Sequence, residues 1–464
     1  MTERAEISFP DEFLWGAATS SYQIEGAVDE DGRGPSIWDT QCRTPGAVRN
    51  GDSGDVAADH YHRYRDDVAM MRSLGLMAYR FSVAWPRIQP TGSGPVNEAG
   101  LDFYRRLVDE LLTAGIQPML TLYHWDLPQA LQDAGGWPAR DTALRFAEYA
   151  GIVFEALHDR VPRWATLNEP WCSSLHGYAD GSHAPGHQDP VEATRTIHHL
   201  LLAHGLAMQT MRRIDPTPAQ GVVLNLQPIR ATGPDPDGSL HDNARRADGL
   251  RNRLWTEAIL RSRYPDDVFS DLEAFGGLPV QDADLEIIAQ PLDWFGINYY
   301  NDELLEYRPG GRLATSPGLW DVAVADPGPD ATDIGWPITP GGLTDLLVSL
   351  KTVYPDLPPV YITENGVAYD DPLIDGTVHD RRRIAYLDAH LRALHAAIDA
   401  GVDVRGYFQW SLLDNFEWSH GYAMRFGIVH VDYETLERTP RDSAHWYRDV
   451  IVRNGLAPRM RDVR

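Results

Sequence analysis

The stretch Val360-Tyr361-Ile362-Thr363-Glu364-Asn365-Gly366-Val367-Ala368 combines a short apolar strand with a carboxylate at the point where that strand ends. The strand-forming residues at 360–363 follow two prolines and precede Gly366, so they predict a buried strand that stops abruptly. A carboxylate in that place is unfavourable unless a neighbouring group stabilises its charge, which makes Glu364 a candidate functional residue. The alternative is a surface glutamate in a turn.

The same pattern occurs earlier, in Arg163-Trp164-Ala165-Thr166-Leu167-Asn168-Glu169-Pro170. Here an apolar strand again runs into a glutamate, and Pro170 then prevents the strand from continuing. Two strands that each end in a carboxylate indicate a pair of acids that face one another. Such a pair is what the cleavage of a glycosidic bond requires, because one acid protonates the leaving oxygen while the other meets the developing cation.

Apolar strand patterns alternate with helical periodicity along the whole chain. The pattern predicts strands that begin near residue 13 and then cover 76–83, 117–123, 163–169, 221–226, 292–300, 360–364 and 404–410. It predicts helices at 61–74, 98–114, 141–160, 190–214, 243–263, 342–354, 381–400 and 441–452. Eight strand-then-helix units are the sequence form of a (β/α)8 (TIM) barrel, an α/β fold.

No linker, low-complexity run or shift in composition divides the chain, so residues 1–464 are expected to form a single catalytic barrel domain. The length beyond a minimal barrel is expected in long βα loops after strands 1, 4, 6 and 8, which would wall a deep pocket. A doubly wound open sheet is the alternative fold. It is not favoured, because no Gly-x-Gly-x-x-Gly turn follows the first strand.

Composition excludes several classes of partner. The net charge of −26 argues against nucleic acid and anionic membrane surfaces, and no apolar run is long enough to span a bilayer. The two cysteines, Cys42 and Cys172, are too few for a disulfide framework and fit a reducing compartment. Residues 1–6 are charged and lack an apolar signal core, so a cytoplasmic location is expected.

In a barrel of this kind the chemistry lies at the carboxyl ends of the strands. The polar and aromatic candidates all fall there: Gln23, Arg80, His124, Asn168, Glu169, Asn298, Tyr300, Glu364 and Trp410. His198, His199 and His204 would be candidates for a metal site, but their spacing matches no metal-binding motif and a helix face explains them better. No metal or cofactor is expected.

Four motifs, in order and over essentially the whole chain, give the sequence a resemblance to a known family. They are Phe13 to Ala27, Thr166-Leu167-Asn168-Glu169-Pro170, Ile362-Thr363-Glu364-Asn365-Gly366, and Trp410-Ser411-Leu412-Leu413-Asp414-Asn415-Phe416-Glu417-Trp418. The sequence resembles the family 1 glycoside hydrolases, the retaining β-glucosidase group. The resemblance implies that Glu169 is the acid/base and Glu364 the nucleophile, with a small β-glucoside or short oligosaccharide as the substrate.

The resemblance also assigns the supporting residues. Those beside the nucleophile are Arg80, Tyr300 and Asn298. Those expected to bind the sugar, with Trp410 beneath its apolar face, are Gln23, His124, Trp125, Asn168, Trp410, Glu417, Trp418 and Phe426. Those expected on the leaving-group (aglycone) side are Trp171, Cys172, His183, Asn225 and Trp336. His176 stands where related chains are expected to have an apolar residue; it either lines that side or is a packed, hydrogen-bonded structural histidine.

A retaining site with carboxyl groups roughly 5 to 5.5 Å apart must ionise them unequally. Arg80 and a hydroxyl from Tyr300 are expected to favour the ionised form of Glu364. The resulting negative charge would raise the pKa of Glu169 and keep that residue protonated.

Within the family, an O-β-glucosidase that also accepts galactosides and fucosides is expected. Glu417 would repel a phosphorylated sugar, and Glu169 stands where the plant thioglucosidases have glutamine. The alternatives are a β-glycosidase that transfers sugar to an acceptor other than water, and a sugar-binding barrel without catalysis. The sequence predicts no oligomeric state.

Overall fold

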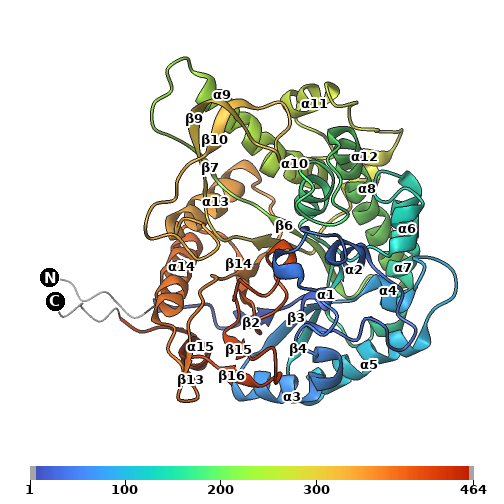
Figure 1. Ribbon diagram of the computed structural model, residues 1–464, viewed down its shortest axis with the longest axis vertical. Helices are drawn as coiled ribbons and strands as arrows, with labels where there is room; N and C mark the ends of the chain where they lie inside the picture. The colour runs from blue at the N-terminus through green and yellow to red at the C-terminus, as the bar shows by residue number, and fades with distance from the viewer. Residues whose placement is uncertain (1–6, 459–464) are drawn as a thin grey trace.

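The computed structural model describes residues 7–458 and contains a closed barrel of eight parallel strands (Figure 1). In order around the barrel these are β2 (Leu14–Ala18), β3 (Ala78–Ser82), β4 (Gln117–Tyr123), β5 (Arg163–Asn168), β6 (Ala219–Asn225), β8 (Trp294–Asn298), β11 (Val360–Asn365) and β14 (Val404–Trp410). β14 pairs with β2 and closes the barrel. The predicted (β/α)8 fold is confirmed.

A helix follows each barrel strand, and the helices surround the barrel in Figure 1. They are α3 (His60–Ser73), α5 (Glu98–Thr113), α7 (Arg140–Leu157), α8 (Pro190–Ile214), α13 (Pro340–Val353), α14 (Arg381–Asp399) and α15 (Asp442–Arg453). The helix expected at 243–263 is α9 (Ser239–Asp248) and α10 (Leu254–Arg261), joined by a π-helical segment, η3 (Gly249–Arg253).

The barrel interior is filled by side chains that alternate between small and large. Ala18, Ala78 and Ala165 leave room for Trp294 and Phe408 in one buried cluster. Gly16 is required there, because a Cβ atom at this position would lie 2.5 Å from the ring of Phe408. The interior is therefore a packed core, and a pocket is possible only beyond the strand ends.

Long segments follow β2, β5, β8 and β14, as expected. The segment after β8 is not all loop, however. It contains β9 (Glu303–Arg312) and β10 (Trp320–Val324), which pair antiparallel, and β9 also pairs parallel with β7 (Ile229–Thr232). This small sheet lies with α9 at the upper left of Figure 1 and packs Leu305 and Val322 on that helix. This sheet was not predicted from the sequence.

Shorter elements complete the described part of the chain. These are β1 (Ile7–Ser8), α1 (Ser21–Ile24), α2 (Ile37–Cys42), η1 (Arg49–Gly51), α4 (Trp85–Ile88), α6 (Gln129–Asp133), η2 (Cys172–His176), α11 (Asp266–Glu273), α12 (Asp284–Ile288), β12 (Leu373–Ile374), β13 (Thr377–Val378), η4 (Trp418–His420), β15 (Val429–Val431), β16 (Arg438–Pro440) and β17 (Gly455–Leu456).

Within residues 7–458 no helix has the length and apolarity needed to cross a membrane. The N-terminal stretch used to infer location lies outside the described residues, so the cytoplasmic location stays a prediction.

A buried ion cluster fixes the segment after β14. The carboxylate of Asp414 accepts hydrogen bonds of 2.7 Å from both Arg425 and Arg441 and one of 3.0 Å from the backbone N–H of Gly427. Asp414 and Arg441 are fully buried, so neither charge is compensated by water. The cluster ties the start of this segment to its far end beside α15.

Substitution Asp414→Asn is expected to lower the free energy of unfolding by about 3–5 kcal/mol, because it leaves two guanidinium groups without their shared counter-charge. Urea unfolding followed by circular dichroism measures the loss. The matched control is Asp403→Asn, which removes an exposed carboxylate paired with Arg405. That change is expected to cost less than about 1 kcal/mol; an equal cost for both variants would contradict the role of the cluster.

Candidate functional site

Two glutamates lie at the carboxyl ends of the barrel strands and line one cavity of about 560 Å³. Glu364 belongs to β11, and Glu169 directly follows β5 with a backbone φ of 48°. Their relative exposures are 3% and 6%, so both carboxyl groups are buried. The positive φ at Glu169 is a strained conformation of the kind that the surrounding structure must impose.

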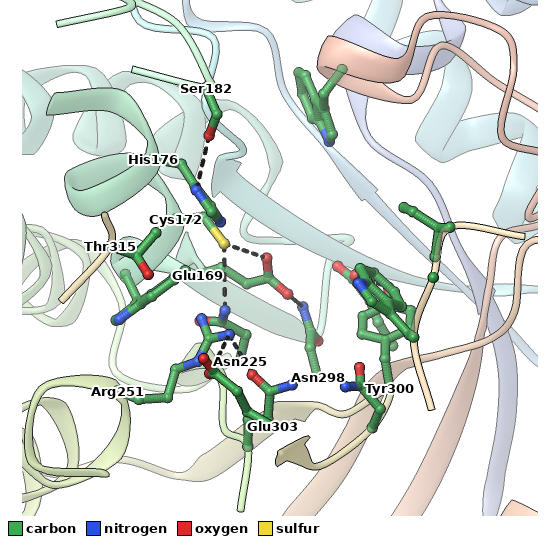
Figure 2. Close-up of a pocket in the computed structure, with 18 of the residues that line it drawn as sticks. Glu169, Cys172, His176, Ser182, Asn225, Arg251, Asn298, Tyr300, Glu303 and Thr315 are labelled. Atoms are coloured by element: carbon green, nitrogen blue, oxygen red, sulfur yellow. Dashed lines mark hydrogen bonds and ion pairs between the residues drawn. The ribbon is translucent and has the colours of Figure 1, made fainter. Parts of the chain in front are cut away.

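Asn298, the last residue of β8, is hydrogen-bonded to Glu169 (Figure 2) and lies close to Glu364. Its Nδ2 donates a hydrogen bond of 2.7 Å to Oε1 of Glu169 and one of 3.1 Å to Asn168, and the same amide lowers the pKa of the Glu364 carboxyl. Thr363 orients the amide by donating to its Oδ1 at 2.7 Å. The two carboxyl groups therefore lie within reach of a single amide.

Glu364 has two further charge-stabilising donors. Nη1 of Arg80 donates to Oε1 at 2.7 Å, and the hydroxyl of Tyr300 donates to Oε2 at 2.7 Å. Burial raises the pKa of Glu364 above its usual range, and these two donors and Asn298 oppose the rise. Arg80 and Tyr300 are therefore placed where the sequence analysis expected them, each on one oxygen of Glu364.

Within residues 7–458, no guanidinium group is hydrogen-bonded to Glu169. Burial, followed by the negative charge of Glu364, raises its pKa to about 7, and the bonds from Asn298 and Cys172 together with the charge of Arg251 oppose the rise. The environments of the two acids thus differ in the expected sense: a cation contacts Glu364, and an anion faces Glu169.

Aromatic side chains form the inner end of the cavity. The lining residues expected to bind the sugar are His124, Trp125, Trp410, Glu417, Trp418 and Phe426. The ring of His124 stacks on Trp410 with centroids 5.8 Å apart, and Trp418 lies 6.1 Å from the same imidazole. Flat apolar ring faces beside carboxylates suit a pyranose, which has an apolar face and a rim of hydroxyls.

Three expected site residues lie behind the cavity wall. Gln23, Arg80 and Asn168 are at most 1% exposed and do not line the cavity. The amide of Gln23 donates to Asn415 at 3.0 Å and to Glu417 at 3.3 Å. Asn168 accepts from Arg80 at 2.6 Å and contacts His124 at 3.1 Å. In this structure all three hold residues that do line the cavity.

All five residues expected on the leaving-group side line the cavity: Trp171, Cys172, His183, Asn225 and Trp336. The ring of Trp171 is already occupied, because the guanidinium of Arg251 lies 3.5 Å from its centroid and the imidazole of His176 meets it edge-on at 4.9 Å. His176 lines the cavity and is also hydrogen-bonded, with Nδ1 2.9 Å from Asp180. Both interpretations of His176 therefore hold.

A polar group formed by Gln227, Arg251 and Glu303 also lines the cavity and was not predicted from the sequence (Figure 2 shows the last two). Arg251 lies 3.8 Å from Glu303 and donates to Gln227, while its Nε and Nη1 are buried without a partner. Arg251 belongs to the π-helical η3 and Glu303 to β9, two features that the sequence analysis did not foresee. The sequence feature that could have indicated β9 is the change from apolar to polar residues along 303–312, a segment that includes two glycines.

The described residues contain no group of three or more His, Cys, Asp or Glu side chains placed to hold a metal ion. On α8, His198 lies between Asp284 and Tyr264, each at 2.8 Å. His204 contacts Thr166 at 2.7 Å. These contacts fit the expected helix-face role.

Glu417 generates a stability prediction. Burial, and then the charges of Glu364 and Glu169, raise its pKa from 4.5 to about 8. A carboxyl group with a raised folded-state pKa contributes stability below pH 4.5, and that contribution is lost as the pH rises to about 8. Glu417→Gln is therefore expected to be more stable than the parent, by on the order of 2 kcal/mol, with the gap opening across this interval.

Thermal unfolding midpoints measured from pH 4 to pH 9 check this prediction. The control is Glu434→Gln, which removes an exposed carboxylate between β15 and β16. The prediction would be contradicted if the difference in unfolding midpoint between Glu417→Gln and the parent did not change with pH, or if the control showed the same change.

Comparisons with known proteins agree with the geometry. The profile of Glycosyl hydrolase family 1 matches residues 5–456. "Thermostable beta-glucosidase B" of Thermobispora bispora is 53% identical over 97% of this chain and 92% of its own length. The "Bifunctional beta-D-glucosidase/beta-D-fucosidase" of Bifidobacterium breve is 47% identical over 96% and 98%. The crystal structure of the psychrophilic β-glucosidase BglU from Micrococcus antarcticus superposes with a TM-score of 0.92 at 48% identity, over 96% of this chain and 98% of that one. The chain is a glycoside hydrolase and belongs to glycosyl hydrolase family 1.

Proposed function

We propose that the protein is a retaining β-glucosidase that releases terminal β-D-glucosyl residues, with Glu364 as the nucleophile and Glu169 as the acid/base. The observation that carries the proposal is the unequal support of two buried carboxyl groups in one cavity. Arg80 and Tyr300 donate to Glu364, whereas the donors to Glu169 among the described residues are an amide and a thiol.

In the first step, an oxygen of Glu364 attacks the anomeric carbon while Glu169 transfers its proton to the departing glycosidic oxygen. The bond from carbon to that oxygen breaks, and a glycosyl ester forms on Glu364. Arg80 and Tyr300 maintain the ionised form of Glu364 before the attack. The raised pKa of Glu169 keeps its proton available at neutral pH.

In the second step, Glu169 acts as a base. Once Glu364 is esterified, its negative charge is gone and the pKa of Glu169 falls. Glu169 then takes a proton from water, the water oxygen attacks the anomeric carbon, and the ester bond to Glu364 breaks. The configuration at the anomeric carbon is therefore retained.

The glucosyl group is proposed to lie over Trp410, with its hydroxyls toward His124 and Glu417. Tolerance of galactosyl and fucosyl groups belongs to the same proposal, because carboxylate and amide groups accept either orientation of a hydroxyl. The name of the relative from Bifidobacterium breve, which includes β-fucosidase, supports this extension.

Two alternatives are less well supported. A sugar-binding barrel without catalysis has no need for two buried carboxyl groups with opposite environments. Transfer to an acceptor other than water is available to any retaining enzyme, because its glycosyl ester reacts with either nucleophile. Product analysis with cellobiose at high acceptor concentration distinguishes transfer from hydrolysis.

Two single variants test the roles. Glu169→Gln is expected to release an activated aryl leaving group in a burst, since that group needs little protonation, and then to turn over about 10²–10⁴-fold more slowly than the parent. Glu364→Gln is expected to give no burst. Stopped-flow absorbance with a dinitrophenyl β-glucoside measures both, and identical behaviour of the two variants would refute the assignment.

The pH dependence of kcat/KM is a second test. The alkaline limb is expected near pH 7, where the free protein loses the proton of Glu169, and the acid limb reports the ionisation of Glu364. Initial rates on an aryl β-glucoside from pH 4 to pH 9 give the profile. A profile that is flat across this range would count against both acids.

A further inference from the structure

A buried thiol contacts the proposed acid/base. Cys172 is the first residue of the π-helical η2, three positions after Glu169, and is 7% exposed. Its Sγ lies 3.3 Å from Oε2 of Glu169 and donates to it, while Nδ2 of Asn225 donates to the sulfur at 3.4 Å. Figure 2 shows the three side chains in this order, from the end of β6 to the carboxyl group.

The thiol keeps its proton and therefore acts as a donor. Burial, and then the negative charge of Glu169, raises the pKa of Cys172 well above its usual range, and only Arg251 opposes the rise. The N–H group of Asn225 that donates to the sulfur strengthens the hydrogen bond from the thiol to Glu169, because hydrogen bonds in a chain polarise one another.

The two oxygens of Glu169 have different donors. Oε1 receives the amide of Asn298 at 2.7 Å, and Oε2 receives the thiol of Cys172 at 3.3 Å. Two donors from separate elements fix the plane of the carboxyl group. A thiol is a weak donor, so it stabilises the ionised form less than a hydroxyl would. This suits a group that must give a proton in one step and accept one in the next.

We propose that Cys172 is a positioning residue for the reaction: its thiol, held by Asn225, fixes the carboxyl plane of Glu169 and favours the ionised form of that group. The inference rests on the proposed acid/base role of Glu169. The thiol itself forms no covalent bond and loses no proton; the proton delivered to the leaving oxygen comes from Glu169.

Other charged and titratable groups also face Glu169. They are Glu364 on β11, Arg251 on η3, and the Tyr300 and Glu417 side chains, which both sense its charge. Within residues 7–458, the sulfur of Cys172 is hydrogen-bonded to Glu169 and Asn225 and to none of these other groups. A change confined to the thiol therefore leaves these groups in place.

The test compares Cys172→Val, which keeps a similar volume without a donor, with Cys172→Ser, which keeps a donor. Without a donor the ionised form of Glu169 is less stable, so its pKa rises. The alkaline limb of kcat/KM is expected to move to higher pH by about half a unit in Cys172→Val. In Cys172→Ser it is expected at or below the position found for the parent protein.

A second readout uses an activated aryl glucoside, for which breakdown of the glycosyl ester limits kcat. The acid limb of kcat then reports ionisation of Glu169 as a base, and in Cys172→Val it is expected to move to higher pH as well. If Cys172 had a purely structural role, Cys172→Val would lower kcat and kcat/KM without moving the alkaline limb of kcat/KM or the acid limb of kcat.

The matched control is Cys42→Val, which changes the other thiol, bonded to Tyr22 at 3.5 Å, and is expected to leave both limbs in place. Cys172→Ala replaces the valine variant if valine prevents folding. The inference would be overturned if the limbs of the pH profiles of Cys172→Val lay at the same pH values as those of the parent protein. Failure of the acid/base assignment is seen separately, as full activity of Glu169→Gln on unactivated glucosides.

Discussion

The ion pair between Arg80 and Glu364 is the interaction on which the site depends. Arg80 is 1% exposed, and its guanidinium donates to Glu364, to the backbone carbonyl of Thr363 and to Asn168. These acceptors lie on β11 and β5, while Arg80 lies on β3, so the contact joins three strands inside the closed barrel. A buried charge of this kind is stable only with a well-placed partner, and the barrel provides the partner.

The division of charge between the acids follows from the same framework. The guanidinium of Arg80 contacts Glu364, whereas Glu169 has neutral donors, Asn298 and Cys172. Each donor belongs to a different element, so the pKa difference between the acids is a property of how the strands are arranged. Burial raises the carboxyl pKa of Glu169, Glu364 and Glu417, which is the cost of placing three acids in one cavity.

The sequence predicted the barrel because each of its strands and helices repeats one strong local signal. Apolar runs end at polar residues, and the helices have amphipathic periodicity. The two acids were predicted for the same reason, since each interrupts an apolar strand. The β7, β9 and β10 sheet was missed because it is buried on one face only and its long strand 303–312 is half polar. Arg251 was missed because nothing in a helical sequence indicates which of its turns is widened, and that turn decides where the guanidinium points.

The proposed leaving-group wall of the cavity includes residues from two such widened turns, Cys172 and His176 from η2 and Arg251 from η3. A π-helical turn holds one residue more than an α-helical turn, so loss of a single residue from either segment would restore an α-helical turn. The side chains presented by that turn would change, while the helix on either side would stay in register. The barrel strands would not have to move. The proposed leaving-group side of the cavity is thus free to diversify by single-residue insertion or deletion, while the side that holds the two proposed catalytic acids is fixed by the strands.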